Sequence, residues 1–237
     1  MHTSRRIGFG QANVEYILIL VCLALVAITS LNLYGAQVAT AYWQVVTAFG
    51  ALADDFSRDL SNWMAVVGTM TINGHKQAAG AWKIKDGRMY GDPWSLNMFK
   101  NFIGGDVTID LKGARLESQG KDWNGYGTLF RASQDSQGRW SGYGFEFEEH
   151  PKGRIQMYFS RWDHGRQTKL GKPQDAPAGF TWTDAQNIVI TAKGNSFSAS
   201  LNGKPLITAT DKVYTSGQVG IYTNVGSAAS FDGFAVR

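Results

Sequence analysis

The sequence has little cysteine and proline, and no block of basic residues. Its single cysteine, Cys22, excludes an intrachain disulfide, and zinc-ligand spacings are absent. The net charge is only +4 and the basic residues are spread out, so we expect no nucleic-acid partner. Hydrophobic residues make up 43% of the chain, which excludes a disordered protein. Five prolines against 28 glycines suit short strands joined by tight turns.

The beginning of the chain places a carboxylate at the mouth of an apolar run. Glu15 lies five residues past Gly10, and residues 17–28 are apolar. A charge at this position is costly to desolvate unless it finds a partner. A secretory signal would instead have a small-residue cleavage site after the apolar run, where residues 29–36 offer only a weak one.

The apolar run continues as a helical pattern beyond the length of a simple anchor. Apolar residues recur at spacings of three and four as far as Leu52, and no proline interrupts residues 11–53. Frequent small residues in this stretch allow helices to approach closely. The pattern predicts one helix over residues 11–53, about 60 Å long. Such a helix suits a bundle of identical helices better than a lone membrane anchor.

Residues 10–20 read Gly-Gln-Ala-Asn-Val-Glu-Tyr-Ile-Leu-Ile-Leu and resemble the class III leader of type IV pilins, most closely the Flp (tight-adherence, type IVb) group. The resemblance implies a leader of residues 1–10 that a prepilin peptidase removes by cutting between Gly10 and Gln11. It also implies that Glu15 and Tyr16 act in assembly, with Glu15 pairing with the N-terminal ammonium of a neighbouring subunit. The alternative is a carboxylate that favours the positive N-terminus of its own helix.

From residue 54 onward the pattern changes to short segments that alternate between apolar and polar residues. Clear examples are residues 106–111, 143–147, 187–191 and 197–201. Turn dipeptides punctuate the region: Asn73-Gly74, Asp86-Gly87 and Asn202-Gly203. These features predict an antiparallel β-sandwich over residues 54–237. Together with the N-terminal helix, the expected fold class is α+β.

The end of the chain resembles the concanavalin A-like lectin/glucanase (laminin-G-like) jelly rolls. Residues 216–221 read Ser-Gly-Gln-Val-Gly-Ile, and residues 231–236 read Phe-Asp-Gly-Phe-Ala-Val. Earlier matches occur in the family's order, among them residues 127–131 and 201–206. The resemblance implies a two-sheet jelly roll whose first and last strands pair. It implies carbohydrate contact only as a common use of this fold.

An acidic stretch, Glu146-Phe147-Glu148-Glu149, superficially resembles the paired acids of the glucanases in this family. On a strand, Glu146 and Glu148 would lie on one face, as retaining hydrolysis requires. The stretch departs from the glucanase motif Glu-x-Asp-x-x-Glu, since its middle residue is Glu and His150-Pro151 replaces the end. We therefore expect a protein that is not an enzyme. In that interpretation the carboxylates are solvated and face Arg131, Arg154 or Arg161.

Large aromatic residues beside glycine and polar residues are the candidate ligand-binding positions, because sugar rings stack on exposed aromatic side chains. The candidates are Trp123, Tyr126, Arg131, Trp140, Tyr143 and Trp162. The alternative is that these tryptophans plug the ends of the sandwich. Asp55 and Asp232, near the paired ends, are candidates for a structural Ca²⁺ with backbone oxygens. No other cofactor is expected.

The main functional hypothesis is a structural pilin subunit. It polymerises with copies of itself through its helix and displays the sandwich on an extracellular filament, where surface glycans are possible partners. Its other partners would be the prepilin peptidase and the pilus assembly machinery, and its location before assembly the cytoplasmic membrane. The alternative is a membrane-anchored lectin or glycoside hydrolase that does not polymerise.

Overall fold

The computed structural model of the chain describes residues 52–150 and 153–237, and the fold is given for these residues. They form strands, turns and loops without a helix, so the predicted α+β class is wrong and the described part is all-β. Leu52 and Ala53, the predicted end of the helix, lie in a strand. The rest of that helix lies outside the described residues, as do Gly10, Gln11, Glu15 and Tyr16. No helix able to cross a membrane occurs between residues 52 and 237 where they are described.

One layer of the sandwich is a nine-stranded sheet, in which most strands follow the order β15-β14-β13-β8-β17-β6-β5. β18 pairs with both β8 and β1 beside this path. The strands are β1 (Leu52–Asp54), β5 (Trp82–Lys85), β6 (Arg88–Gly91), β8 (Val107–Leu116), β13 (Gln186–Lys193), β14 (Ser196–Leu201), β15 (Lys204–Thr210), β17 (Ala229–Phe231) and β18 (Gly233–Val236).

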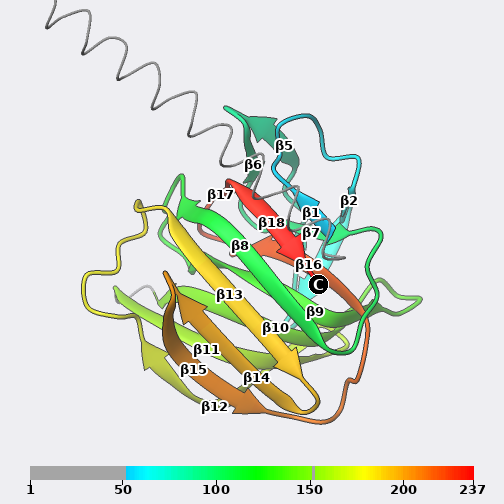
Figure 1. Ribbon diagram of the computed structural model, residues 1–237. Helices are drawn as coiled ribbons and strands as arrows, with labels where there is room; N and C mark the ends of the chain where they lie inside the picture. The colour runs from blue at the N-terminus through cyan, green and yellow to red at the C-terminus, as the bar shows by residue number, and fades with distance from the viewer. Residues whose placement is uncertain (1–51, 151–152) are drawn as a thin grey trace, which may run out of the picture. The chain divides into compact units, whose positions relative to one another are not determined.

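The other layer is a seven-stranded sheet with the order β12-β11-β10-β9-β16-β7-β2. Figure 1 shows the two sheets facing each other. The strands of the second sheet are β2 (Trp63–Ala65), β7 (Leu96–Phe99), β9 (Asn124–Gln134), β10 (Trp140–His150), β11 (Arg154–Asp163), β12 (Arg166–Asp175) and β16 (Gln218–Thr223). A separate hairpin consists of β3 (Thr69–Ile72) and β4 (His75–Ala78).

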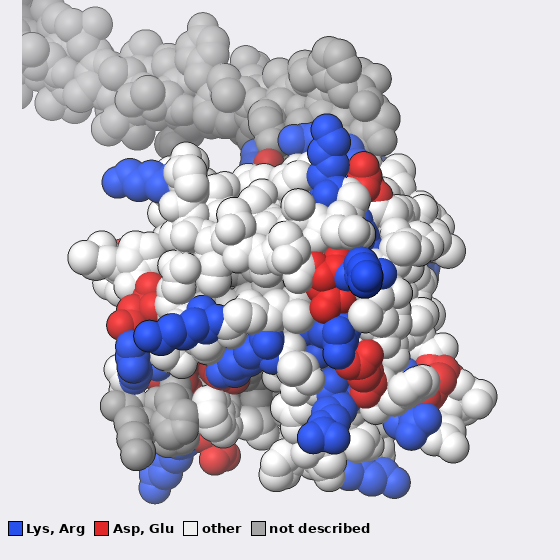
Figure 2. Space-filling model, turned by 90° about the horizontal axis from the view of Figure 1, so that it is seen from below, with Lys and Arg blue, Asp and Glu red and all other residues white. Residues whose placement is uncertain are grey.

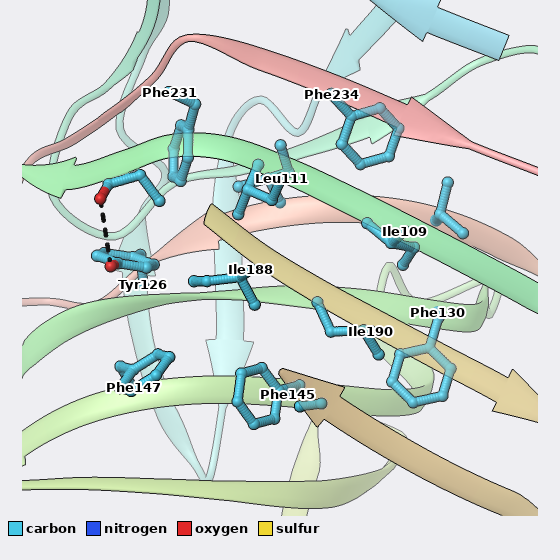
Figure 3. Close-up of a cluster of buried hydrophobic side chains, with 14 of the residues drawn as sticks. Ile109, Leu111, Tyr126, Phe130, Phe145, Phe147, Ile188, Ile190, Phe231 and Phe234 are labelled. Carbon is cyan, nitrogen blue, oxygen red and sulfur yellow. Dashed lines mark hydrogen bonds between the residues drawn. The ribbon is translucent and has the colours of Figure 1, made fainter. Parts of the chain in front are cut away.

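The main core lies between the two sheets. Successive side chains of a strand point to opposite faces, so Ile109 and Leu111 of β8 turn inward together. In Figure 3, side chains from β8 and β13 point toward the phenylalanines of β9 and β10. Burying one such side chain contributes about 1.5–3 kcal/mol, so this layer supplies most of the apolar stabilisation.

A second, smaller core covers part of the outer face of the seven-stranded sheet. Met70 of the β3–β4 hairpin is buried there against Met98 and Trp162. A backbone hydrogen bond joins the hairpin to the sheet: the Asn73 backbone N–H donates to the Gly165 carbonyl at 2.8 Å. The central strands of this sheet are therefore buried on both faces, and the remaining outer face forms a bounded hollow.

The predicted turns and the predicted closure of the domain are confirmed. Asn73, Asp86 and Asn202 have φ between 50° and 54°, and each is followed by a glycine with positive φ. Two such residues in succession make the tight turns that match the twist of a hairpin. The first and last described strands pair in the register Leu52↔Val236, as the family resemblance implied.

Candidate ligand-binding site

Surface charge alone does not single out a site. Figure 2 shows basic and acidic side chains intermixed on the face seen there. A cavity of about 510 Å³ does mark one, on the outer face of the seven-stranded sheet. Side chains of four strands line its floor: Glu146, Glu148, Tyr158, Trp162, Gln167, Lys169 and Tyr222. The hairpin and the loops contribute Asn73, His75, Gln77, Trp94, Asp122, Trp123 and Asn224.

The pairing of strands explains how the floor is assembled. Tyr222, Gly127, Glu146 and Tyr158 are successive partners across β16, β9, β10 and β11. Cross-strand partners project from the same face of a sheet, so the three side chains form one row. Gly127 is essential to this row, because a Cβ there would lie 2.6 Å from the Tyr222 hydroxyl. The missing side chain lets the Tyr222 ring lie over the sheet toward Glu146.

Glu146 is the most unusual group in the cavity, because its side chain is a carboxyl that is only 2% exposed. Gln167 Nε2 donates a hydrogen bond to its Oε1. Burial, together with the charge of Glu148, raises the pKa of Glu146 to about 8. Lys169 and the hydroxyls of Tyr158 and Tyr222 act in the opposite direction. The uncharged acid is thus the favoured form of Glu146 at neutral pH.

Lys169 supplies the positive charge of this site. Its ammonium lies 3.4 Å from Glu148 Oε1 and 3.8 Å from the centre of the Tyr158 ring. An ammonium above an aromatic face is stabilised by about 0.5–2 kcal/mol, depending on its hydration. The Lys169 side chain is 38% exposed. The cavity therefore combines a buried acid, a partly shielded ion pair and an aromatic surface.

Several polar atoms of the cavity wall are buried without a hydrogen-bond partner of normal geometry among the described residues. They are Trp94 Nε1, Tyr158 Oη, Tyr222 Oη and Asn224 Nδ2. A buried donor or acceptor left unpaired costs about 1–3 kcal/mol. A ligand carrying hydroxyl or amide groups would remove that cost. Aromatic rings lie beside these atoms, with Trp162 and Tyr222 packed edge to face at 5.6 Å.

The structure brings two of the six predicted ligand-binding residues to this cavity. Trp123 lies at its rim and is 38% exposed, whereas Trp162 is part of its floor and is 3% exposed. Tyr126 and Tyr143 are buried in the main core, and Trp140 in the second core. These three aromatic side chains therefore lie in the cores and do not line the cavity.

Arg131 has a structural role at another place in the sandwich. Its guanidinium donates to the backbone carbonyls of Gly105, Tyr214 and Gly194 at 2.7–3.1 Å. The side chain is 2% exposed, so it joins loops of both sheets and is not available to a ligand. It therefore does not face Glu146.

The expected environment of the acidic stretch is also corrected. Glu146 is buried, not solvated, and it contacts Gln167 instead of an arginine. Arg154 pairs with Asp175, and Arg161 pairs with Asp163 and Asp211. The alternation of β10 was visible in the sequence, but its partners come from strands far along the chain. Gln167, Lys169 and Tyr222 had no local signal beyond the period of two.

The two predicted calcium ligands do not form a cluster of oxygen donors. The Asp232 carboxylate is bound by the Arg88 guanidinium, and Asp55 accepts a hydrogen bond from the Ser57 amide at 3.1 Å. Across residues 52–150 and 153–237, no group of three or more acidic, histidine or cysteine side chains is arranged to hold a metal.

Comparisons with known proteins identify the fold. No protein-family model and no curated protein matches the chain. A β-glucanase of Bacillus licheniformis is similar over 78% of this chain and 97% of its own, with a TM-score of 0.59 and 13% identity. The carbohydrate-binding module CBM66 of Bacillus subtilis is similar over 73% and 93%, with a TM-score of 0.56 and 18% identity. The described part thus has the concanavalin A-like, or galectin-like, β-sandwich.

These similarities overturn one expectation and leave another without support. The expectation that the protein is not an enzyme is overturned, because β-glucanases share this fold, including a laminarinase catalytic domain of Thermotoga petrophila with 11% identity and a TM-score of 0.53. At such identities the likeness establishes the fold and no activity. The similar proteins give no support to a pilin leader or a pilin family.

The buried acid leads to a pH-dependent stability. Between about pH 5 and pH 8 the folded chain keeps the Glu146 proton that the unfolded chain has released, so stability falls as the pH rises. Glu146→Gln removes this effect. As the pH rises, the free energy of unfolding of Glu146→Gln relative to that of the natural chain should increase by up to ~1.4 kcal/mol per pH unit. Urea denaturation of the full-length proteins across this range measures the difference.

Asp86→Asn is the matched control, because it also converts an acid to its amide, in an exposed turn. The difference between the Glu146→Gln and Asp86→Asn curves isolates the contribution of the buried position. Parallel curves for the natural chain and Glu146→Gln would show that Glu146 is ionised like an ordinary surface acid.

Proposed function

We propose that the β-sandwich binds a carbohydrate in the cavity over the seven-stranded sheet. The observation that carries the proposal is the set of buried polar atoms without a hydrogen bond of normal geometry that this cavity collects beside aromatic rings. A sugar presents hydroxyl groups along its edge and apolar C–H groups on its faces. The first would pair with Tyr158, Tyr222 and Asn224, and the second would lie against Trp123 or Trp162.

The geometry suits a small part of a glycan better than a flat polymer surface. The cavity is bounded by the β3–β4 hairpin and by loops that contribute Asp122 and Asn224. Its volume of about 510 Å³ lies within the range of ordinary ligand pockets, which is about 300–1,000 Å³. A binding role also agrees with the fold similarity to a carbohydrate-binding module, CBM66 of Bacillus subtilis.

Replacing the rim tryptophan tests this proposal. Trp123→Ala should weaken glycan binding by about 1–2 kcal/mol, or roughly 5–30-fold, because an aromatic stacking surface is lost. A glycan array with the full-length chain identifies the ligand, and calorimetry measures its affinity. Val213→Ala is the control, since Val213 is 52% exposed and lies outside the cavity. The proposal fails if no glycan binds, or if both variants bind like the natural chain.

A glycoside hydrolase is the second candidate function, and the carboxyl pair on β10 favours it. Glu146 and Glu148 project from the same face two residues apart, and their environments differ. The raised pKa of Glu146 suits a proton donor, while Glu148 lies 3.4 Å from the Lys169 ammonium. The departure from the glucanase motif stands against it, because Pro151 occupies the position of the last glutamate.

Hydrolysis makes a distinct prediction for these two acids. If the pair is catalytic, the full-length chain should release reducing ends from a β-glucan, and Glu148→Gln should lower the rate at least ~100-fold. Absence of product from β-1,3-, β-1,4- and mixed-linkage glucans, with binding intact, would exclude a glucanase.

The N-terminal segment carries a separate hypothesis, which rests on the sequence resemblance of residues 5–40 alone. In this hypothesis the segment polymerises and places the sandwich on an extracellular filament, with the cytoplasmic membrane as its earlier location. The test is N-terminal sequencing of the mature protein from its native surface fraction. The hypothesis expects a start at Gln11, and a start at Met1 would contradict it.

A further inference from the structure

The ammonium of the protein's own Lys169 occupies part of the cavity, which shows that the site can stabilise an alkylammonium group. Lys169 Nζ lies over the Tyr158 ring and beside Glu148, at 3.8 Å and 3.4 Å. The Lys169 side chain reaches this position from β12, at the edge of the seven-stranded sheet. Its flexible stem and 38% exposure allow the ammonium to leave for solvent when another group takes its place.

Acidic side chains outnumber lysine and arginine in the lining of the cavity. Glu146, Glu148 and Asp122 line the cavity. Among the described residues that line it there is one lysine, Lys169, and no arginine. The Tyr158 and Tyr222 hydroxyls, which lie beside these acids, are buried there without a hydrogen bond of normal geometry, and so is Asn224 Nδ2, which also points to a ligand group. Aromatic faces beside carboxylates are the surroundings that favour a cation with apolar substituents.

We infer that the cavity selects a saccharide bearing a free amino group, whose ammonium binds between Glu146, Glu148 and the Tyr158 ring in place of Lys169. This inference rests on the proposed glycan-binding function. The hydroxyls of the same sugar would pair with Tyr222 and Asn224. Neutral sugars have these hydroxyls too, so both classes of sugar can make those contacts. The ammonium is the feature that distinguishes the two classes of ligand.

Binding of an ammonium should change the protonation of Glu146. In the free protein, burial favours the uncharged acid of Glu146, and a bound ammonium would favour its carboxylate. Binding would then release the Glu146 proton to the solvent, while the ligand keeps its own. The charged and titratable groups that face Glu146 or share its cavity are Glu148 from β10, Tyr158 from β11, Lys169 from β12, Tyr222 from β16, His75 from β4 and Asp122 from the loop before β9.

Three ligands that differ only at carbon 2 of the sugar test the inference. They are the β-1,4-linked tetrasaccharides of glucosamine, N-acetylglucosamine and glucose, measured by calorimetry with the full-length chain at about pH 5.5, where the sugar amines are already protonated. The glucosamine tetramer should bind at least ~10-fold more tightly than the other two. It should release about one proton per ligand, detected as a dependence of the heat on the ionisation enthalpy of the buffer.

Two variants separate the roles of the charged groups. Glu146→Gln keeps the size of the side chain, and it should reduce the preference to less than ~3-fold and abolish proton release. Lys169→Met should instead raise the affinity for the glucosamine tetramer about 3–10-fold, because it removes the competing ammonium. Weaker binding by Lys169→Met would overturn the inference, since Lys169 would then be a ligand contact.

The outcomes distinguish this inference from the proposed function. If the neutral tetramers bind as tightly as the glucosamine tetramer, glycan binding stands and amino selectivity falls. If none of the three tetramers binds while the array identifies another glycan, glycan binding again stands and amino selectivity falls. If no glycan binds at all, both fall. Binding of 1,4-diaminobutane as tight as that of the glucosamine tetramer would overturn the saccharide part and leave a site for simple amines.

Discussion

A carboxyl group buried in the middle of a sheet is the constraint on which the candidate site depends. Glu146 lies between Phe145 and Phe147, whose side chains fill the core on the opposite face of β10. Shifting this strand by one residue would move the acid into the core and both rings into the cavity. The register that stabilises the sandwich therefore also places the acid in the cavity.

The surroundings of Glu146 explain how the fold tolerates it. Gln167 donates a hydrogen bond to it, and Gly127 leaves the space through which the Tyr222 ring extends toward it. The small core under the β3–β4 hairpin closes one side of the cavity and limits access of water. A group that costs stability is kept where it can contact a ligand, which is the usual relation between a binding site and its scaffold.

Much of the sandwich could be predicted from the sequence, because its signals are local. The period of two in residues 106–111 and the dipeptides such as Asn73-Gly74 specify strands and tight turns without knowledge of the partners. The pairing of the first and last strands followed from the family resemblance. The class was wrong because the described residues contain no helix, and the expected helix end at Leu52 and Ala53 is the start of β1.

The site was harder to predict, because it is made by pairing across distant strands. Tyr222 and Glu146 are 76 positions apart in the sequence numbering and become neighbours only through Gly127 of β9. Aromatic residues beside glycine were a poor guide, since Tyr126 and Tyr143 point into the core while Trp123 reaches the rim. Whether an aromatic side chain is a binding surface depends on the face it occupies, and composition does not contain that information.

The central claim is that the cavity around Glu146 is where a glycan binds. The most direct measurement is carbon-13 NMR of the glutamate carboxyl groups in the full-length chain during titration with the glycan that the array identifies. The account predicts that the Glu146 signal, assigned by its loss in Glu146→Gln, shifts in proportion to occupancy. A glycan that binds at saturation and leaves the Glu146 signal unchanged would contradict it.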